Sequence, residues 1–592
     1  MEPQQPPESP AVDRRTLIKG GLAAGGLLVG GLTIRALADP SEKPAAPPRP
    51  LPRAANERRP NILVILVDQM RFPQWLGASA LGPALPPNLQ RLRAGAVSFA
   101  RHYTVSNDCS PSRAALVTGL YTHQTGCMIT GGSTLDPGFP TWGTMLREHG
   151  YNTRWLGKWH LTHHDNRWTA SSGEQALERY GFAGGVYPSP DGAPGQGARI
   201  DPRIAAEFES WFRAEGGGPP WCTTVSFVNP HDIAWWYVWS NRVRSERDSP
   251  RTARSLPPNF ETPQDLIERA KPRLQRSLQD TAAASFGPVP FTGPGAEARW
   301  LGMLDLYTKL QREVDGHIGR VLAALESKPE VAANTVVIFT SDHGEYGASH
   351  GLRGKGAAAY EEGIRVPLIV KDPRAVLTRS PEQVRTQLTS SVDVAPLLLT
   401  IATGGQQWRN DRHYSQIAGR ADLARILAEP EAPGRDHVLH ATDEVVTEFA
   451  IEPYAFDAPL HVVAVRTAEA KYATYSHWPA EGIVPLSQGE EAELYDYRTH
   501  GGRLEVENTA GGSPLEATMR AKLERAFATE LREPLPSRLA EAHARGFADY
   551  FSTARGAAQA ATLSRRARSE REVGPIDGLE PKAVKGAADS RP

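Results

Sequence analysis

Cysteine is scarce in this chain, which has only Cys109, Cys127 and Cys222 among its 592 residues. Three cysteines cannot form a disulfide framework, and a chain of this length can bury large cores without one. The length suits one large α/β domain together with a smaller one. If Cys109 has a chemical role, only Cys127 and Cys222 remain, and the sequence leaves open whether they form a disulfide.

The chain also lacks an excess of charge of either sign. Its 66 lysine and arginine residues nearly balance 67 aspartate and glutamate residues. A balanced chain creates no global field that would attract nucleic acid or a membrane surface, so we expect no nucleic-acid partner. A basic cluster at residues 565–568 is followed by Glu570 and Glu572, and this mixture is typical of a solvated tail.

The apolar run nearest the N-terminus is short. Arg14 and Arg15 precede a glycine-rich apolar run at residues 20–34 and an Ala-Leu-Ala sequence at 36–38. A transmembrane anchor is the alternative, but a short run rich in glycine matches a bilayer poorly. Twin arginines, a short apolar region and an A-x-A site predict a twin-arginine (Tat) export signal over residues 1–38. We therefore expect the Tat translocon as a partner, and a periplasmic or extracellular location without a lipoprotein anchor.

Beyond the signal, the chain divides into a linker, two domains and a tail. Residues 39–59 are rich in proline and predict an extended linker. We expect a large catalytic domain over residues 60–404, a small α+β domain with an antiparallel sheet over 405–535, and a tail over 536–592. Residues 240–300 lack clean periodicity and are interpreted as an insertion.

Strand-length apolar runs alternate with helical patterns in the large domain, which predicts an α/β fold. The fold class we expect is a large, mixed, mostly parallel sheet sandwiched by helices. The expected strands of this sheet are residues 61–67, 151–156, 221–228, 336–340 and 365–370. The expected helices are residues 87–99, 140–149, 306–325 and 391–402, and the small domain has expected strands at 438–442, 460–467 and 471–476.

Titratable residues follow several of the expected strands. Asp68-Gln69 ends the first strand, and Asp342-His343 ends a later one. Ligands of open α/β sheets bind at the carboxyl ends of the strands, so these side chains should converge at one edge. Two carboxylates with a nitrogen donor suit a divalent cation. Taken alone, Asp342-His343 could instead be a helix cap beside a surface histidine.

The stretch from Cys109 to Gly119, CSPSRAALVTG, reads as a loop that leads into a helix N-terminus. Such a place favours an anion, and Arg113 adds donors suited to oxyanions. The alternative is a buried structural cysteine beside a surface arginine. The run C-x-P-S-R followed by L-x-T-G resembles the signature of the type I, formylglycine-dependent sulfatases of the alkaline phosphatase superfamily. That resemblance implies that a formylglycine-generating enzyme converts Cys109 to formylglycine.

The same resemblance implies a set of site residues. Residues Asp68, Gln69, Asp342, His343 and modified Cys109 would hold one divalent cation. Gln69 is the weak member, because an amide donates less charge than a carboxylate, and the alternative is that it only orients its neighbours. We expect Ca²⁺, with Mg²⁺ and Mn²⁺ as alternatives. Catalytic positions would be Cys109, Arg113, Lys158, His160, His231 and Lys355. The hydrated aldehyde would attack sulfur, the lysines and Arg113 would neutralise sulfate oxygens, His231 would protonate the leaving alcohol, and His160 would accept a proton. Thr130 stands where many members have an asparagine, which leaves one expected substrate donor in doubt.

The expected function is that of an exported sulfatase acting on a small-molecule or saccharide sulfate ester. The alternative is a phosphonate monoester or phosphodiester hydrolase, because these enzymes share the Asp-Gln and Asp-His pairs. A third possibility is a non-catalytic binding protein on the same scaffold. The aromatic cluster Trp235, Trp236, Tyr237 and Trp239 either packs as core or lines the leaving-group side of the pocket.

Overall fold

The computed structural model describes residues 59–73, 85–162, 176–184, 189–237, 249–448, 450, 453–455, 457–479 and 482–572. The predicted export signal, nearly all of the linker and Trp239 lie outside these residues. Among the described helices, none combines the length and the apolar character needed to cross a bilayer.

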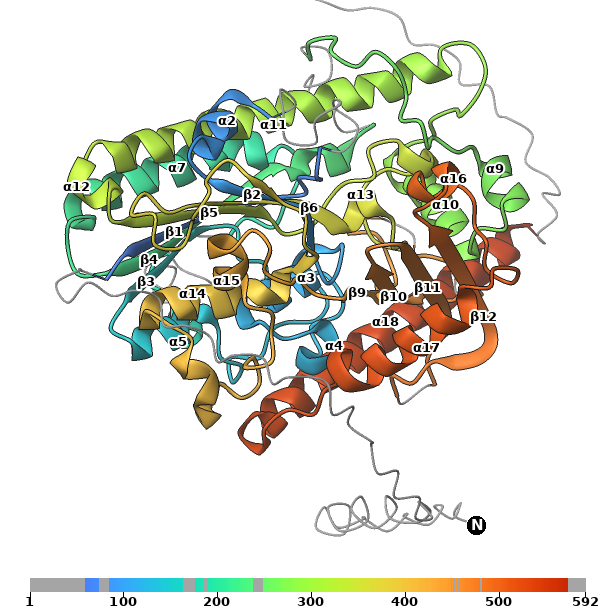
Figure 1. Ribbon diagram of the computed structural model, residues 1–592. Coiled ribbons are helices and arrows are strands. Elements are labelled where there is room, and N and C mark those ends of the chain that lie inside the picture. The colour runs from blue at the N-terminus through green and yellow to red at the C-terminus, as the bar shows by residue number, and fades with distance from the viewer. Residues whose placement is uncertain are drawn as a thin grey trace, which may run out of the picture. The chain divides into compact units, whose positions relative to one another are not determined.

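The large sheet has eight strands (Figure 1). Its order is β3 (Asn152–Gly157), β4 (Trp221–Pro230), β1 (Asn61–Asp68), β5 (Thr335–Ser341), β6 (Arg365–Lys371), β2 (Val97–Tyr103) and β7 (Val384–Arg385), with β8 (Thr389–Ser390) also beside β2. Strands β3, β4, β1 and β5 are parallel neighbours, whereas β6 runs antiparallel to both β5 and β2. The predicted mixed, mostly parallel sheet is confirmed.

Helices cover both faces of this sheet, as Figure 1 shows. Strand β1 is buried along its whole length, with Ile62, Val64 and Leu66 in one core and the alternate residues in the other. This alternation explains its continuous apolar sequence, because each face of a buried strand needs apolar side chains. The first core contains α3 (Cys109–Thr118), α5 (Trp142–Glu148), α14 (Val394–Thr403) and α15 (Leu423–Ala428), and the second contains α2 (Pro87–Arg93), α7 (Gln196–Glu215) and α11 (Ala296–Glu326).

The prediction of one helix over residues 87–99 was wrong. The helix α2 ends at Arg93, and residues 97–103 form β2, which pairs with β6. Gly95, with φ +74°, lies between the two elements in the left-handed region that favours glycine. Leu89 and Leu92 do point into the core from α2, but Val97 belongs to the strand. A short apolar spacing does not separate a helix from a helix followed by a strand.

A second, four-stranded antiparallel sheet follows in the C-terminal part of the chain. Its order is β12 (Leu486–Asp496), β11 (Ala470–His477), β10 (His461–Thr467) and β9 (His437–Thr442), which confirms the expected antiparallel sheet. One face packs against α17 (Glu516–Ala526). The other face meets α10 (Arg273–Phe286), through Leu274 and Leu278, so part of the expected insertion is helical and covers this sheet.

The segment expected as a tail contains α18 (Ala540–Glu572), and its first turns are docked. Asp549 accepts hydrogen bonds from the backbone N–H and the hydroxyl of Thr134, at 2.8 and 3.0 Å. Gly546 lies so close to Thr125 and Gly126 that a Cβ on it would be 2.0 Å from the Thr125 carbonyl oxygen. This helix therefore fixes the loop that follows α3 and the short α4 (Thr122–Thr125).

Candidate active site

Adjacent strands bring the predicted side chains to one edge of the large sheet. Asp68 is the last residue of β1, Lys158 follows β3, His231 follows β4, and Asp342 follows β5. These four strands are neighbours in the order β3-β4-β1-β5 and run parallel. The convergence that the sequence predicted is therefore a consequence of parallel pairing, which places all four carboxyl ends together.

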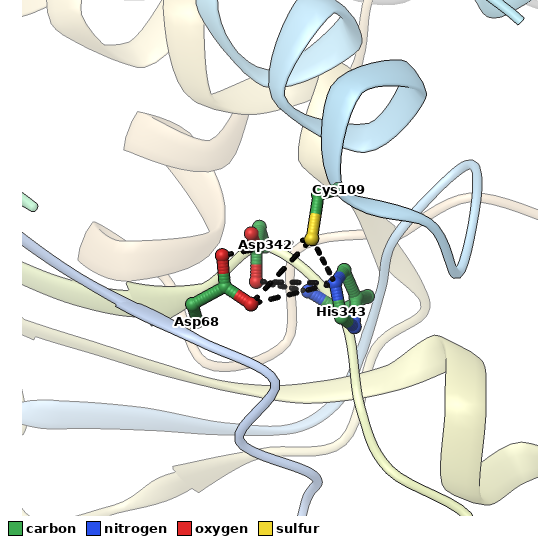
Figure 2. Close-up of side chains that lie close together, drawn as sticks. All are labelled: Asp68, Cys109, Asp342 and His343. Carbon is green, nitrogen blue, oxygen red and sulfur yellow. Dashed lines mark hydrogen bonds and ion pairs between the residues drawn. The ribbon is translucent and has the colours of Figure 1, made fainter. Parts of the chain in front are cut away.

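Cys109 is the first residue of α3 and is fully buried at the centre of this edge (Figure 2). Its Sγ atom lies 3.2 Å from His343 Nε2, 3.6 Å from Asp68 Oδ1 and 2.6 Å from Lys355 Nζ. Burial, followed by the nearby Asp68 and Glu448 carboxylates, raises the pKa of the Cys109 thiol well above its ordinary value. Every residue of α3 is buried, so the helix N-terminus faces the site and not solvent.

Arg113 forms ion pairs with both the Asp68 and the Asp342 carboxylates. Its Nη2 donates to Asp68 Oδ2 at 2.9 Å and its Nε donates to Asp342 Oδ2 at 2.8 Å, with all three side chains excluded from solvent. Its Nη1 donates to the carbonyl oxygen of Lys158 and to the Ser226 hydroxyl. All three nitrogens are thus committed to protein acceptors. In this geometry Arg113 positions the two carboxylates, and its expected role toward the substrate stays a prediction.

The donor set fits a hard divalent cation. Asp68, Asp342, His343 and Cys109 present ligand atoms that all lie within 4.8 Å of one another. His343 Nδ1 donates to the Gly344 carbonyl oxygen at 2.9 Å, which leaves Nε2 as the lone-pair donor that faces Cys109. Lys158, His231 and Arg113 hold the pKa of Asp68 well below its usual range, although burial alone would raise it. The carboxylate is therefore available in its charged form.

Gln69 lies beside Asp342 and has an amide oxygen without a hydrogen-bond partner. Its Nε2 donates to Glu345 and its backbone N–H donates to Asp342 Oδ1 at 3.1 Å, but its buried Oε1 has no partner. Buried polar atoms are nearly always satisfied, and amide oxygens are ordinary ligands of Ca²⁺. Gln69 has φ +68°, and Tyr307 fixes this turn by donating to the Gln69 carbonyl oxygen at 2.7 Å.

Basic side chains also surround the Cys109 sulfur and contact the candidate cation ligands. Lys158 Nζ is 2.8 Å from Asp68 Oδ2 and 3.6 Å from the Cys109 sulfur. Lys355 Nζ is 3.1 Å from His231 Nε2 and belongs to the loop after β5. Burial and the neighbouring lysines lower the pKa of His231 to about 4. The structure thus brings together all of the site residues that the sequence predicted.

Sequence reasoning missed Glu448. Its carboxylate comes from the segment after β9 and lies 2.8 Å from Lys355 Nζ, 3.2 Å from His231 Nε2 and 3.4 Å from His160 Nε2. An acidic sequence at 443–448 is the only signal for it in the chain, and no spacing links that sequence to the other site residues. Thr130, the position in doubt, donates its backbone N–H to Glu444 of the same segment.

The other two cysteines and the described tryptophans of the aromatic cluster are buried. Cys127 and Cys222 are buried free thiols, so they form no disulfide. Trp236 is 1% exposed and packs against Trp300 of α11, with ring centroids 5.6 Å apart. Trp235 packs edge-on against Phe286 and donates its indole N–H to the Gly192 carbonyl oxygen. Both indoles therefore belong to the core.

Comparison with known proteins gives a consistent result. A relative from Escherichia coli K12, described as "Uncharacterized sulfatase YidJ", is 28% identical over 373 residues, which are 58% of this chain and 68% of that protein. Two solved structures share the fold over 81% of this chain. A phosphonate monoester hydrolase from Silicibacter pomeroyi matches with TM-score 0.58, 22% identity and 96% coverage of its chain. BT4656, solved with its substrate D-glucosamine-2-N,6-O-disulfate, matches with TM-score 0.57, 19% identity and 99% coverage of its chain.

The Sulfatase family model matches residues 60–404, which begin at the first strand of the large sheet and end after α14. The match contains Asp68, Cys109, Asp342 and Lys355, while Glu448 lies beyond it. The chain therefore belongs to the sulfatase family of sulfuric ester hydrolases within the alkaline phosphatase superfamily.

Proposed function

We propose that this protein is an exported sulfatase that hydrolyses a sulfate ester by means of a formylglycine formed from Cys109. The observation that carries the proposal is the place of the Cys109 side chain. Its sulfur contacts both the candidate cation ligands Asp68 and His343 and the ammonium groups of Lys158 and Lys355. A nucleophile in contact with a cation site and two lysines suits attack on an anionic ester, whose charge must be neutralised.

The roles of the surrounding residues follow from their positions. A divalent cation held by the donor set would supply Lewis-acid polarisation of a sulfate oxygen and of the residue 109 side chain. Lys158 and Lys355 bind the remaining sulfate oxygens, because their ammonium groups flank the Cys109 sulfur. His231 is neutral in the free site, and a bound anionic substrate would raise its pKa so that it could protonate the leaving oxygen. His160 stands on the same side of the pocket to accept a proton. Arg113 keeps the two carboxylates in place.

Two measurements test this function. Mass spectrometry of the peptide that contains Cys109, after co-expression with a formylglycine-generating enzyme, should give the mass of the aldehyde. The same preparation should hydrolyse at least one member of a panel of sulfated sugars, aryl sulfates and choline sulfate. Full activity from a protein whose residue 109 is only a free thiol would contradict the mechanism.

A phosphonate monoester or phosphodiester hydrolase is the second candidate. Gln69 and His343 at the cation site favour it, because that enzyme class shares the Asp-Gln and Asp-His pairs, and a phosphonate monoester hydrolase shares this fold. Steady-state rates on paired aryl sulfate and aryl phosphodiester substrates separate the two. A higher kcat/KM for the sulfate supports the sulfatase, and the reverse supports the second candidate. A non-catalytic binding protein would turn over neither and would retain a thiol at Cys109.

Export by the Tat pathway is the part of the proposal that concerns location, and it rests on Arg14 and Arg15 with the apolar run that follows. The Tat pathway carries folded proteins, which suits a cysteine that must be modified inside the cell. Changing both arginines to lysine should retain the precursor in the cell, because the pair is an address read by a receptor. Cell fractionation measures this, with Arg35→Lys as the control. Undiminished export of the double variant would mean that another route is used.

A further inference from the structure

The carboxylate of Glu448 occupies the part of the pocket where an anionic substrate would bind. Its Oε2 atom is 2.8 Å from Lys355 Nζ, 3.2 Å from His231 Nε2 and 3.5 Å from the Cys109 sulfur. Its Oε1 atom is 3.4 Å from His160 Nε2. The side chain is only 8% exposed, so this is an enclosed contact and not a surface ion pair.

These partners are the groups that the proposed function assigns to the substrate. Lys355 would hold a sulfate oxygen, His231 would serve the leaving oxygen, and the residue 109 side chain would approach sulfur. A carboxylate and a sulfate group are both oxyanions that accept hydrogen bonds from ammonium and imidazole donors. Glu448 Oε2 lies within 3.5 Å of Lys355 Nζ, His231 Nε2 and the Cys109 sulfur at once, so a sulfate oxygen held by the same three groups would occupy the same space. The Glu448 carboxylate and the substrate therefore exclude one another from this position.

The segment that carries Glu448 is fixed at its base. Asp443 accepts a hydrogen bond from the Trp478 indole at 3.0 Å, and Glu444 accepts one from the Thr130 backbone. Thr447 pairs with the Tyr454 hydroxyl at 2.9 Å. Glu448 thus reaches the edge of the large sheet from a support that belongs to the small sheet. The Glu448 side chain could therefore leave the pocket without movement of β3, which precedes Lys158, or of the loop that carries Lys355.

We propose that Glu448 is an intramolecular competitor that fills the oxyanion position of the free enzyme and that the sulfate group of the substrate displaces. Glu448 determines the affinity and selectivity of the pocket for anions. An anion binds only if its contacts with Lys355 and His231 are more favourable than those of the Glu448 carboxylate. The identity of the displacing group as sulfate rests on the proposed function. The observation that the Glu448 carboxylate fills the pocket does not rest on the proposed function.

The test is a calorimetric titration of the metal-loaded protein with inorganic sulfate and, in parallel, with inorganic phosphate. An anion that binds only when Glu448 has left has its apparent affinity reduced by the fraction of molecules in which the pocket is open. If the carboxylate fills the pocket in nine molecules out of ten, Glu448→Gln should bind sulfate about tenfold more tightly than wild type. The KM for a substrate should fall in step, while kcat stays within about twofold.

Glu444→Gln is the matched control, because it makes the same chemical change in the same segment while Glu444 contacts the Thr130 backbone and not Lys355. Its sulfate affinity should equal that of wild type. Glu448→Asp retains the charge on a shorter side chain and should fall between wild type and Glu448→Gln. It also provides a second reading if Glu448→Gln proves unstable in thermal unfolding.

Four outcomes overturn the proposal. Loss of bound metal in Glu448→Gln would make Glu448 a metal ligand. Weaker sulfate binding would make it a group that organises the anion site, and unchanged binding would mean that the carboxylate does not compete. A fall in kcat at constant KM would make it catalytic.

A protein that turns over no sulfate ester would refute the proposed function but would leave the titration, and thus this inference, fully testable. Tighter binding of phosphate than of sulfate in every variant would assign the pocket to phosphoryl substrates.

Discussion

Arg113 is the residue on which the position of both cation-binding carboxylates depends. It pairs with Asp68 and Asp342 where neither carboxylate has access to solvent. A lysine in its place has one ammonium group and cannot bridge two carboxylates in a planar fork. The conservative exchange is therefore not conservative at this position.

We expect Arg113→Lys to lower the free energy of unfolding by about 3–5 kcal/mol, because it leaves a buried carboxylate unpaired. Chemical denaturation of the metal-free protein measures this value. Arg320→Lys is the control, since Arg320 makes a similar two-bond contact with Glu209 at the surface, where such pairs contribute about 1 kcal/mol or less. An equal loss of unfolding free energy in the two variants would mean that the buried ion pairs of Arg113 stabilise the protein no more than the surface pair of Arg320.

Gln69 offers a second test at the level of a residue. Gln69→Ala removes the unpartnered Oε1 atom and should weaken Ca²⁺ binding by about tenfold or more, since hard cations need several oxygen ligands. The measurement is the calcium dependence of the thermal unfolding midpoint. Gln275→Ala is the matched control, because that buried amide is already bonded to Tyr360 and Tyr475. Unchanged calcium dependence in Gln69→Ala would remove Gln69 from the cation site.

At the scale of elements, the helix α18 determines how firmly the loop after α3 is held. Gly546 approaches the backbone of Thr125 and Gly126, and the hydroxyl and backbone N–H of Thr134 donate to Asp549 on the same helix. Only glycine permits this approach, because any Cβ would overlap a carbonyl oxygen that cannot move independently of α4. The helix is therefore a part of the folded body that supports the active-site side of the protein.

Gly546→Ala should destabilise the protein by about 1–3 kcal/mol, the usual cost of overpacking, and should expose α18 to limited proteolysis. Gly556→Ala in the same helix is the control. A Cβ at Gly556 would meet no atom within 4 Å, and alanine is a better helix former than glycine by about 1 kcal/mol. Chemical denaturation of the two variants should therefore give changes of opposite sign. A stabilising effect at both positions would show that the helix does not dock where the close contact places it.

At the scale of the whole molecule, acid stability depends on histidines that fold in neutral form. His102 is fully buried, hydrogen-bonded to Thr389 at 3.0 Å, and burial lowers its pKa from 6.5 to about 4, although Asp393 opposes the shift and Arg435 adds to it. The unfolded state therefore binds a proton at a pH where the folded state does not. The stability that depends on neutral His102 is present above pH 6.5 and is lost as the pH falls toward 4.

We expect His102→Gln to be less stable than wild type at pH 7 and to lose less stability than wild type on acidification. Between pH 7 and pH 4 the difference between the two proteins should shift by up to about 3 kcal/mol in favour of the variant. Free energies of unfolding measured at several pH values test this, and the exposed His500→Gln serves as the control. Parallel curves for wild type and His102→Gln would mean that His102 does not fold in neutral form.

The sequence by itself determined the α/β class, the strands of the main sheet and the residues that gather at its edge. Parallel strands buried on both faces have continuous apolar sequences, and their carboxyl ends lie at one edge of the sheet. The sequence therefore predicted that Asp68, His231 and Asp342 lie close together. The cysteine signature then named the family. The error at residues 87–99 arose because a short apolar spacing fits a helix as well as a helix followed by a strand.

Only the tertiary structure decided how the site is completed. The site depends on contacts between segments far apart in the chain. These are the ion pairs of Arg113 with two carboxylates, the hydrogen bonds of Gln69 to Asp342 and Glu345, and the contact of Glu448 with Lys355. Glu448 lies 339 residues from Cys109 on the support of another sheet, and α18 docks across more than 400 residues. Hydrophobic periodicity and strand-end rules describe local structure and neighbouring strands. They carry no information about which distant carboxylate a buried lysine will meet, because packing of the complete chain selects that partner.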